Sequence, residues 1–304
     1  MARILLRIAQ ASCYTFKTDF PYIHPSICDG GRTRAVIGFF DSGFGGLTVM
    51  RSVVALLPQY DYLYLGDSAR VPYGNRSADR VYEFTRQAVE FLFRRGCPLI
   101  IIACNTASAN ALRRIQQEYL PEAFPERRVL GVIRPAAEAI VEGSCRSVGI
   151  LATEGVVASG AYLAEIGKLD PAIAIVQQAC PLLVPIVEAG EQDRHIADVA
   201  VADYLERLFA HNGPIDAILL ACTHYPILKR TIERHLPAGV ALIDQGPVVA
   251  QKLKDYFRRH GEMEKKVTRR GERIFFTTDD CDKFDRLARI FYGTSVTSKL
   301  IALE

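Results

Sequence analysis

Short apolar segments recur along the chain from residue 35 to its end, separated by stretches with helical character. The segments are apolar at consecutive positions and rich in branched side chains, which is typical of parallel strands buried on both faces. Nine segments are predicted as strands: 35–40, 62–66, 99–103, 128–132, 147–152, 172–176, 217–221, 240–243 and 273–277. The helical stretches include 77–96, which ends at a glycine after two arginines. This alternation predicts an α/β fold with helices on both faces of mainly parallel sheets.

Polar and reactive residues follow four of the predicted strands. DSGFGG and DSARVPYG follow the first two strands, and the strands at 99–103 and 217–221 end in CNT and CTH. Cys104 and Cys222 are 118 residues apart and occupy matching positions. Ligands of doubly wound sheets bind beyond the carboxyl ends of the strands. We therefore expect two pseudo-symmetric doubly wound domains with the active site in the cleft between them.

The two cysteines are candidates for reactive thiols. A thiol between a strand and a helix experiences the helix dipole, which lowers its pKa from about 8.5 toward neutrality. Asn105-Thr106 and Thr223-His224 are predicted to cap those helices or to bind an anionic ligand. A single such cysteine would more often be a small buried hydrophobe. Two matching sites favour a reactive pair.

Different reactions use thiols in different numbers. Disulfide exchange usually uses a C-x-x-C pair, and acyl transfer needs only one nucleophile. Proton exchange at a carbon centre with inversion needs two bases on opposite faces, and two facing thiols would supply them. Asp41 and His224 are placed to hold the protons that Cys104 and Cys222 exchange. Their alternative roles are an N-cap for Asp41 and a core or capping histidine for His224.

The glycines after Asp41 could indicate a phosphate loop, but the motif is incomplete. GFGGLT has Thr48 at the third glycine position of G-x-G-x-x-G, and no G-K-[ST] follows. The segment instead predicts a tight turn whose backbone N–H groups face a smaller anion such as a carboxylate.

Composition limits the classes of function. The chain has 304 residues, is 49% hydrophobic and carries a net charge of +3, which is too small to indicate nucleic acid or an anionic membrane surface. Its eight cysteines include no C-x-x-C pair, and no H-x-x-x-H occurs, so no metal site is expected. Reduced cysteines in apolar runs suit the cytoplasm. No apolar run reaches the roughly 18 residues of a membrane span.

Residues 1–34 do not follow this pattern. Arg7 interrupts a short apolar run, and no clean cleavage site follows it. We interpret residues 1–34 as an extension outside the core fold, partly disordered or regulatory, with a targeting peptide as the alternative.

The motifs at the strand ends resemble those of glutamate racemases, cofactor-independent enzymes that supply D-glutamate for peptidoglycan synthesis. The matching segments are FDSGFGGLTV, GDSARVPYGNRS, ACNTASA, CPLLVPIVEAG and CTHYP. The resemblance implies neither a metal nor pyridoxal phosphate. It also implies one domain from 35–127 plus 245–304, which carries Cys104, and a second from 128–244, which carries Cys222.

The resemblance assigns roles to individual residues. It implies that Cys104 removes the α-proton of D-glutamate with help from Asp41, and that Cys222 removes that of L-glutamate. His224 and Glu188 would assist Cys222, although Glu188 could also be an exposed helix residue. The implied substrate-binding residues are Asp41, Ser42, Tyr73, Gly74, Asn105, Thr106, Thr153, Thr223 and His224.

The sequence departs from the family pattern at two positions. Val156 stands where relatives often have a second threonine after Thr153, and Ala221 replaces a common glycine, which is tolerable if its φ is negative. The family also implies a homodimer. Some members with extensions require a muramyl nucleotide activator, and some glutamate racemases bind DNA gyrase. The alternatives are a racemase of another amino acid in the same superfamily and a non-catalytic relative that binds a metabolite or partner protein.

Overall fold

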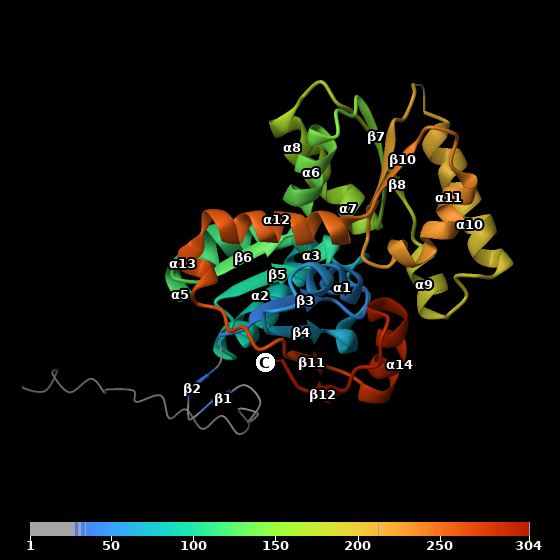
Figure 1. Cartoon of the computed structure of the whole chain (residues 1–304). Coiled ribbons are helices and arrows are strands. Elements are labelled where there is room, and N and C mark those ends of the chain that lie inside the picture. Colours follow the sequence, from blue (N-terminus) through green and yellow to red (C-terminus); the bar gives the residue numbers. More distant parts are fainter. Residues whose placement is uncertain (1–27, 30–31, 34, 212, 304) are drawn as a thin grey trace, which may run out of the picture.

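Two parallel sheets form the framework of the molecule, which is a computed structural model describing residues 28–29, 32–33, 35–211 and 213–303 (Figure 1). The six-stranded sheet has the order β12 (Ser298–Leu300), β11 (Arg273–Thr277), β4 (Tyr62–Gly66), β3 (Ile37–Asp41), β5 (Leu99–Ile102) and β6 (Arg128–Gly131). The four-stranded sheet has the order β10 (Ala241–Ile243), β9 (Ala217–Ala221), β7 (Ser147–Ala152) and β8 (Ala174–Ala179). Every pairing in both sheets is parallel. The predicted α/β fold is confirmed.

The two sheets share a strand order that supports the predicted pseudo-symmetry. In the larger sheet the chain forms β3, adds β4 on one side, and then crosses to add β5 and β6 on the other. In the smaller sheet β7, β8, β9 and β10 are added in the same sequence. Each sheet therefore has a switch point between its first and third strands, where doubly wound folds bind ligands. Cys104 and Cys222 follow the third strand of their respective sheets.

Helices cover both faces of the sheets. The α-helices are α1 (Leu47–Leu56), α2 (Ala78–Arg94), α3 (Asn105–Asn110), α4 (Leu112–Arg114), α5 (Leu120–Ala123), α6 (Ile133–Glu142), α7 (Glu154–Ser159), α8 (Ala161–Leu169), α9 (Leu183–Glu188), α10 (His195–Phe209), α11 (Lys229–His235), α12 (Gln245–Arg259), α13 (Gly261–Glu264) and α14 (Cys281–Tyr292). Short 3-10 helices η2 (Ser68–Arg70) and η4 (Tyr225–Leu228) and a π-helical turn η3 (Ile115–Tyr119) complete the set. No helix in the described part of the chain is long and apolar enough to cross a membrane.

The period of two along each strand divides its side chains between two cores. Phe39 of β3 packs in one cluster with residues of α1, α12 and α14, while Phe40 packs on the opposite face with α2. The first cluster continues into the four-stranded sheet through Leu220 and residues of α10. The opposite face of that sheet packs on α6 and α8. One apolar cluster thus joins the two sheets.

Strand pairing refines where the chain passes between the sheets. The segment 128–131 was expected to begin the second domain, but as β6 it pairs with β5 in the six-stranded sheet. The chain therefore leaves that sheet after Gly131 and returns after Ile243. We keep the two-domain division as a proposal, with its first boundary moved to follow Gly131. Most of the predicted extension 1–34 lies outside the described residues, and its described part contains the antiparallel pair β1 (Cys28–Asp29) and β2 (Arg32–Thr33).

Candidate active site

Asp41 ends the first strand of the larger sheet, and its carboxylate is fully buried. The carboxylate accepts a hydrogen bond from the backbone N–H of Gly43 at 2.9 Å, within the tight turn that the glycines predict. Burial raises the pKa of Asp41, while His224 and the N–H groups of the turn act in the opposite direction. The turn thus fixes a carboxyl group that can hold a proton beside the thiols.

Cys104 is itself the N-cap of α3, in place of the predicted cap by Asn105-Thr106. Its sulfur accepts a hydrogen bond from the backbone N–H of Ala107 at 3.4 Å and lies 3.5 Å from the hydroxyl oxygen of Ser42. These contacts bring the turn after β3 against the thiol at the end of β5. Ser42, one of the residues expected to bind substrate, therefore lies beside Cys104.

Cys222 has a different local structure from the predicted one. No α-helix begins at this thiol: His224 caps the short 3-10 helix η4, and α11 starts only at Lys229. The Nδ1 atom of His224 lies 4.0 Å from the Cys222 sulfur, and its Nε2 atom lies 3.0 Å from Oε1 of Glu188. The ring also packs edge-on against Phe291. Cys222, His224 and Glu188 form a chain of contacts leading outward from the thiol.

The prediction that helix N-termini lower both thiol pKa values is wrong. Burial, with the Asp41 carboxylate as a second cause, raises the pKa of Cys104 to about 11 despite the opposing bonds from Ser42 and Ala107. Burial also raises the pKa of Cys222, and the nearby Cys104 and Asp41 add to the increase. Desolvation of a buried anion outweighs one N–H bond at the start of a six-residue helix.

The ends of the two sheets meet at these residues. A Cβ atom added to Gly45 would lie 2.2 Å from Oγ1 of Thr223 and 2.5 Å from Nδ1 of His224, so only glycine allows this approach. The hydroxyl of Thr48 donates to the carbonyl oxygen of Thr223 at 2.9 Å, and Thr223 donates to Asp41 at 3.4 Å. The structure therefore brings the Asp41 turn of the larger sheet into direct contact with the CTH segment of the smaller one.

A second set of contacts joins the segments after β4 and β5 to the start of α7. The hydroxyl oxygens of Thr106 and Thr153 are 3.0 Å apart, and the N–H of Gly155 donates to the carbonyl oxygen of Gly74 at 2.8 Å. The hydroxyl of Tyr73 donates to Oδ2 of a buried aspartate, Asp67, at 2.5 Å. Thr106 and Thr153, two of the residues expected to bind substrate, are thus adjacent, and the Tyr73 hydroxyl is hydrogen-bonded within the protein.

The structure accommodates both departures from the family pattern, Val156 and Ala221. Val156 is fully buried in the core between the four-stranded sheet and its helices, so its side chain packs with apolar neighbours. Ala221 ends β9, and positive φ among the described non-glycine residues occurs at Ser144 alone. The condition for tolerating Ala221 is met.

Sequence reasoning missed Asp67, Tyr162 and Gln245, whose side chains contact expected site residues. Asp67 directly follows β4 and begins the strand-end segment DSARVPYG, but the sequence analysis assigns it no role. Gln245 and Tyr162 both bond to Asn105 from helices far away in the sequence. No local pattern marks either of them.

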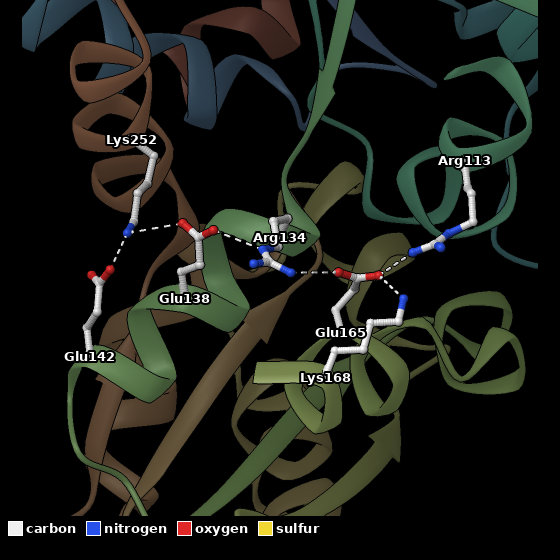
Figure 2. Close-up of polar contacts among 7 residues, drawn as sticks. All are labelled: Arg113, Arg134, Glu138, Glu142, Glu165, Lys168 and Lys252. Carbon is white, nitrogen blue, oxygen red and sulfur yellow. Dashed lines mark hydrogen bonds and ion pairs between the residues drawn. The ribbon is translucent and has the colours of Figure 1, made fainter. Parts of the chain in front are cut away.

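A cavity of about 740 Å³ lies between the sheets and is lined mainly by α4, α6, α8 and α12. Figure 2 shows the ion pairs along it, with Glu165 between Arg134 and two further cations, and Lys252 between two carboxylates. The pairs are Arg113–Glu165, Lys168–Glu165, Arg134–Glu165, Arg134–Glu138, Lys252–Glu138 and Lys252–Glu142. Arg113 and Lys252 belong to helices that pack on the larger sheet, and their partners to helices on the smaller one. The pairs therefore connect the two halves.

Six cysteines are free thiols, and the described side chains hold no metal cluster. Cys97, Cys104, Cys145, Cys180, Cys222 and Cys281 are free thiols. Within the described ranges, no group of three or more His, Cys, Asp or Glu side chains is arranged to hold a metal ion.

Comparisons with known proteins agree with this arrangement. The family model for Asp/Glu/hydantoin racemases matches residues 37–253. A glutamate racemase of Geobacter metallireducens is 39% identical over 259 residues, covering 84% of this chain and 92% of the relative. The crystal structure of a glutamate racemase from Bacillus anthracis has a TM-score of 0.80 at 32% identity, covering 88% of this chain and 98% of that one. The crystal structure of a glutamate racemase from Francisella tularensis in complex with D-glutamate has a TM-score of 0.79 at 33% identity. The match covers 89% of this chain and 98% of that one.

The chain belongs to the Asp/Glu/hydantoin racemase family. Within that family it groups with the glutamate racemases, which are amino-acid isomerases.

Proposed function

We propose that the protein interconverts L- and D-glutamate by proton transfer between the α-carbon and two thiols. Cys104 removes the α-proton of D-glutamate, and Cys222 removes that of L-glutamate. The observation that carries the proposal is the matched placement of the two cysteines, each after the third strand of its sheet and each beside its own polar partners. Inversion follows because the second thiol donates its proton to the opposite face of the carbon.

The raised pKa values of Cys104 and Cys222 affect how a thiolate forms in this site. Raised pKa values favour neutral thiols near pH 7, so one proton must leave a thiol before reaction. The substrate's ammonium group would favour a thiolate beside it, because an opposite charge lowers a thiol pKa. Asp41, with its raised pKa, is placed to take up a proton near Cys104, and His224, hydrogen-bonded to Glu188, is placed to do so near Cys222.

The proposal includes no metal and no pyridoxal phosphate, as the resemblance implies. Negative charge that develops on the substrate must then be stabilised by fixed donors in a water-poor cleft. We assign this role and substrate binding to Ser42, Tyr73, Gly74, Asn105, Thr106, Thr153, Thr223 and His224, together with Asp41. Support comes from their convergence around the two thiols and from the relative that binds D-glutamate.

Racemisation by thiol variants tests the proposal. Cys104→Ala and Cys222→Ala should each lower the rate with either enantiomer by about a thousandfold, because one of two required proton transfers is lost. Circular dichroism of L- or D-glutamate measures this rate. Cys97→Ala is the matched control, because Cys97 is also a buried thiol but precedes β5 and lies at its other end. Full activity in either of the first two variants would contradict the assignment.

We further propose that the reaction takes place in the cytoplasm, that the enzyme forms a homodimer, and that its D-glutamate is used for peptidoglycan. These three statements follow from the family resemblance. Size-exclusion chromatography with light scattering tests the dimer.

A muramyl nucleotide is the activator we propose for the cavity between the sheets. A glutamate racemase of Escherichia coli, 25% identical with a TM-score of 0.68, was crystallised with L-glutamate and the activator UDP-MurNAc-Ala. Here the cavity is lined by five cations, Arg113, Arg134, Lys168, Lys252 and Arg259, against two carboxylates, Glu138 and Glu165. This excess of positive charge suits a diphosphate. Rates measured with and without UDP-MurNAc-Ala test the assignment.

A further inference from the structure

Three buried polar side chains form a closed ring of hydrogen bonds behind Asn105. The Nδ2 atom of Asn105 donates to Oε1 of Gln245 at 2.7 Å, Nε2 of Gln245 donates to the hydroxyl of Tyr162 at 2.5 Å, and that hydroxyl donates to Oδ1 of Asn105 at 2.6 Å. The exposed fractions are 2% for Asn105, 0% for Tyr162 and 2% for Gln245, so solvent cannot replace these partners.

All three bonds run in the same direction around the ring. A tyrosine hydroxyl has one proton, and here the proton goes to Asn105 while the oxygen accepts from Gln245. Burial raises the pKa of Tyr162, so it keeps this proton at all ordinary pH values. Because each group both donates and accepts, rotating one amide alone by 180° would bring the two amide oxygens or the two amide nitrogens together. In the arrangement observed here, the ring therefore holds the Asn105 amide with Oδ1 toward Tyr162 and Nδ2 toward Gln245.

The members of the ring come from three helices on both sides of the cleft. Asn105 is the first residue of α3 and follows Cys104, Gln245 is the first residue of α12, and Tyr162 lies in α8. Tyr162 belongs to the core of the smaller sheet, whereas Asn105 follows a strand of the larger one. The ring thus ties the start of α3 to the other half of the molecule.

One hydrogen-bond donor of Asn105 is not used by the ring. An amide NH₂ group has two N–H bonds, and the ring takes one. The second remains for a ligand, and its direction is determined by the first. We propose that Tyr162 and Gln245 are positioning residues for the proposed racemase reaction: they hold Asn105 so that its remaining N–H meets an anionic group of the substrate. This inference rests on the proposed function.

A double-mutant cycle separates positioning from general packing. The values of kcat and KM for L-glutamate are compared for wild type, Tyr162→Phe, Asn105→Ala and the double variant. Tyr162→Phe should raise KM about tenfold with a smaller change in kcat, because an amide that is free to reorient no longer presents its donor to bound substrate. In the Asn105→Ala background the same substitution should change kcat/KM by less than about twofold, because its effect passes through Asn105.

Tyr62→Phe is the matched control. The Tyr62 hydroxyl is also buried and donates to the carbonyl oxygen of Leu57 at 2.8 Å, but Tyr62 begins β4 at the end remote from the cleft. The Tyr62→Phe variant should be less stable than wild type, but its KM for L-glutamate should not rise comparably. Equal factors for Tyr162→Phe in both backgrounds, or an unchanged KM, would overturn the positioning role.

Side-chain amide NMR of the ligand-free protein tests the ring without any turnover. The NH₂ signals of Asn105 and Gln245 should exchange slowly with water, and both should shift and exchange faster in Tyr162→Phe. Unchanged signals would overturn the ring. A wild-type enzyme that does not racemise glutamate would instead refute the proposed function, and the positioning role with it, whatever the amide signals show.

Discussion

At the residue scale, the properties of Cys104 depend on burial more than on the helix that follows it. The sequence predicts a thiol at a helix N-terminus, and the structure confirms that position. The sequence could not reveal that the sulfur is desolvated and lies near the Asp41 carboxylate, both of which raise its pKa. These effects depend on residues brought together by folding. Sequence reasoning therefore located the thiol but gave the wrong sign for its pKa shift.

The raised pKa predicts how the ligand-free Cys104 responds to pH. Only the thiolate reacts with iodoacetamide, and with a pKa of about 11 the thiolate fraction at pH 7 is about one in ten thousand. The alkylation rate of Cys104, followed by mass spectrometry of its peptide, should rise about tenfold per pH unit between pH 7 and 10. A rate that already levels off near pH 8 would contradict the neutral resting thiol.

At the scale of elements, buried strands were predictable and edge strands were less so. The strands β4, β7, β9 and β11 have the predicted bounds. β8 was predicted at 172–176 but extends to Ala179 through Gln177 and Gln178, because at the edge of the sheet its side chains are only half-buried. β12, a three-residue edge strand containing Lys299, was missed for the same reason. The other two edge strands, β6 and β10, were predicted to within one residue, so the search for continuous apolar runs fails where polar residues interrupt an edge strand.

The ring around Asn105 could not be predicted at all. Its members are separated by 57 and 83 residues along the chain, and each lies in a helix whose local pattern gives no sign of the others. The strand-end rule found Asn105 because this residue belongs to the CNT motif. It did not find the residues that orient it.

The close approach of α7 to the loop after β4 gives a prediction for Gly155. A Cβ atom there would lie 2.8 Å from the carbonyl oxygen of Gly74, a backbone atom that cannot rotate away. Gly155→Ala should lower stability by about 1–3 kcal/mol and raise KM for glutamate, because it separates α7 from this loop. Urea unfolding and steady-state kinetics measure the two effects.

Gly167→Ala is the control for this substitution. Gly167 lies within α8 and has no neighbour near an added Cβ, so alanine should leave KM unchanged and stabilise the helix by about 0.5–1 kcal/mol. Equal changes in stability and KM for Gly155→Ala and Gly167→Ala would contradict the interpretation of Gly155.

At the scale of the whole molecule, the two similar sheets place the ends of their third strands, and hence the two thiols, near each other. The sequence predicted this relation from the repeated strand-Cys-polar pattern, and the common strand order supports it. The cavity and its ion pairs between the two halves were not predicted, because surface charges on separate helices carry no local signal of their pairing. A reaction that inverts a carbon centre uses this architecture directly, since each half would supply one base.

The most direct test of the two-thiol account is the early distribution of deuterium during racemisation in deuterated water. Starting from L-glutamate, the D-glutamate formed first should carry deuterium at the α-carbon, while the remaining L-glutamate should still carry protium. The reverse should hold when D-glutamate is the starting enantiomer, because each thiol serves one face and exchanges its proton with solvent. Equal deuterium in both enantiomers from the first turnovers would contradict two separate bases and would indicate a single base serving both faces.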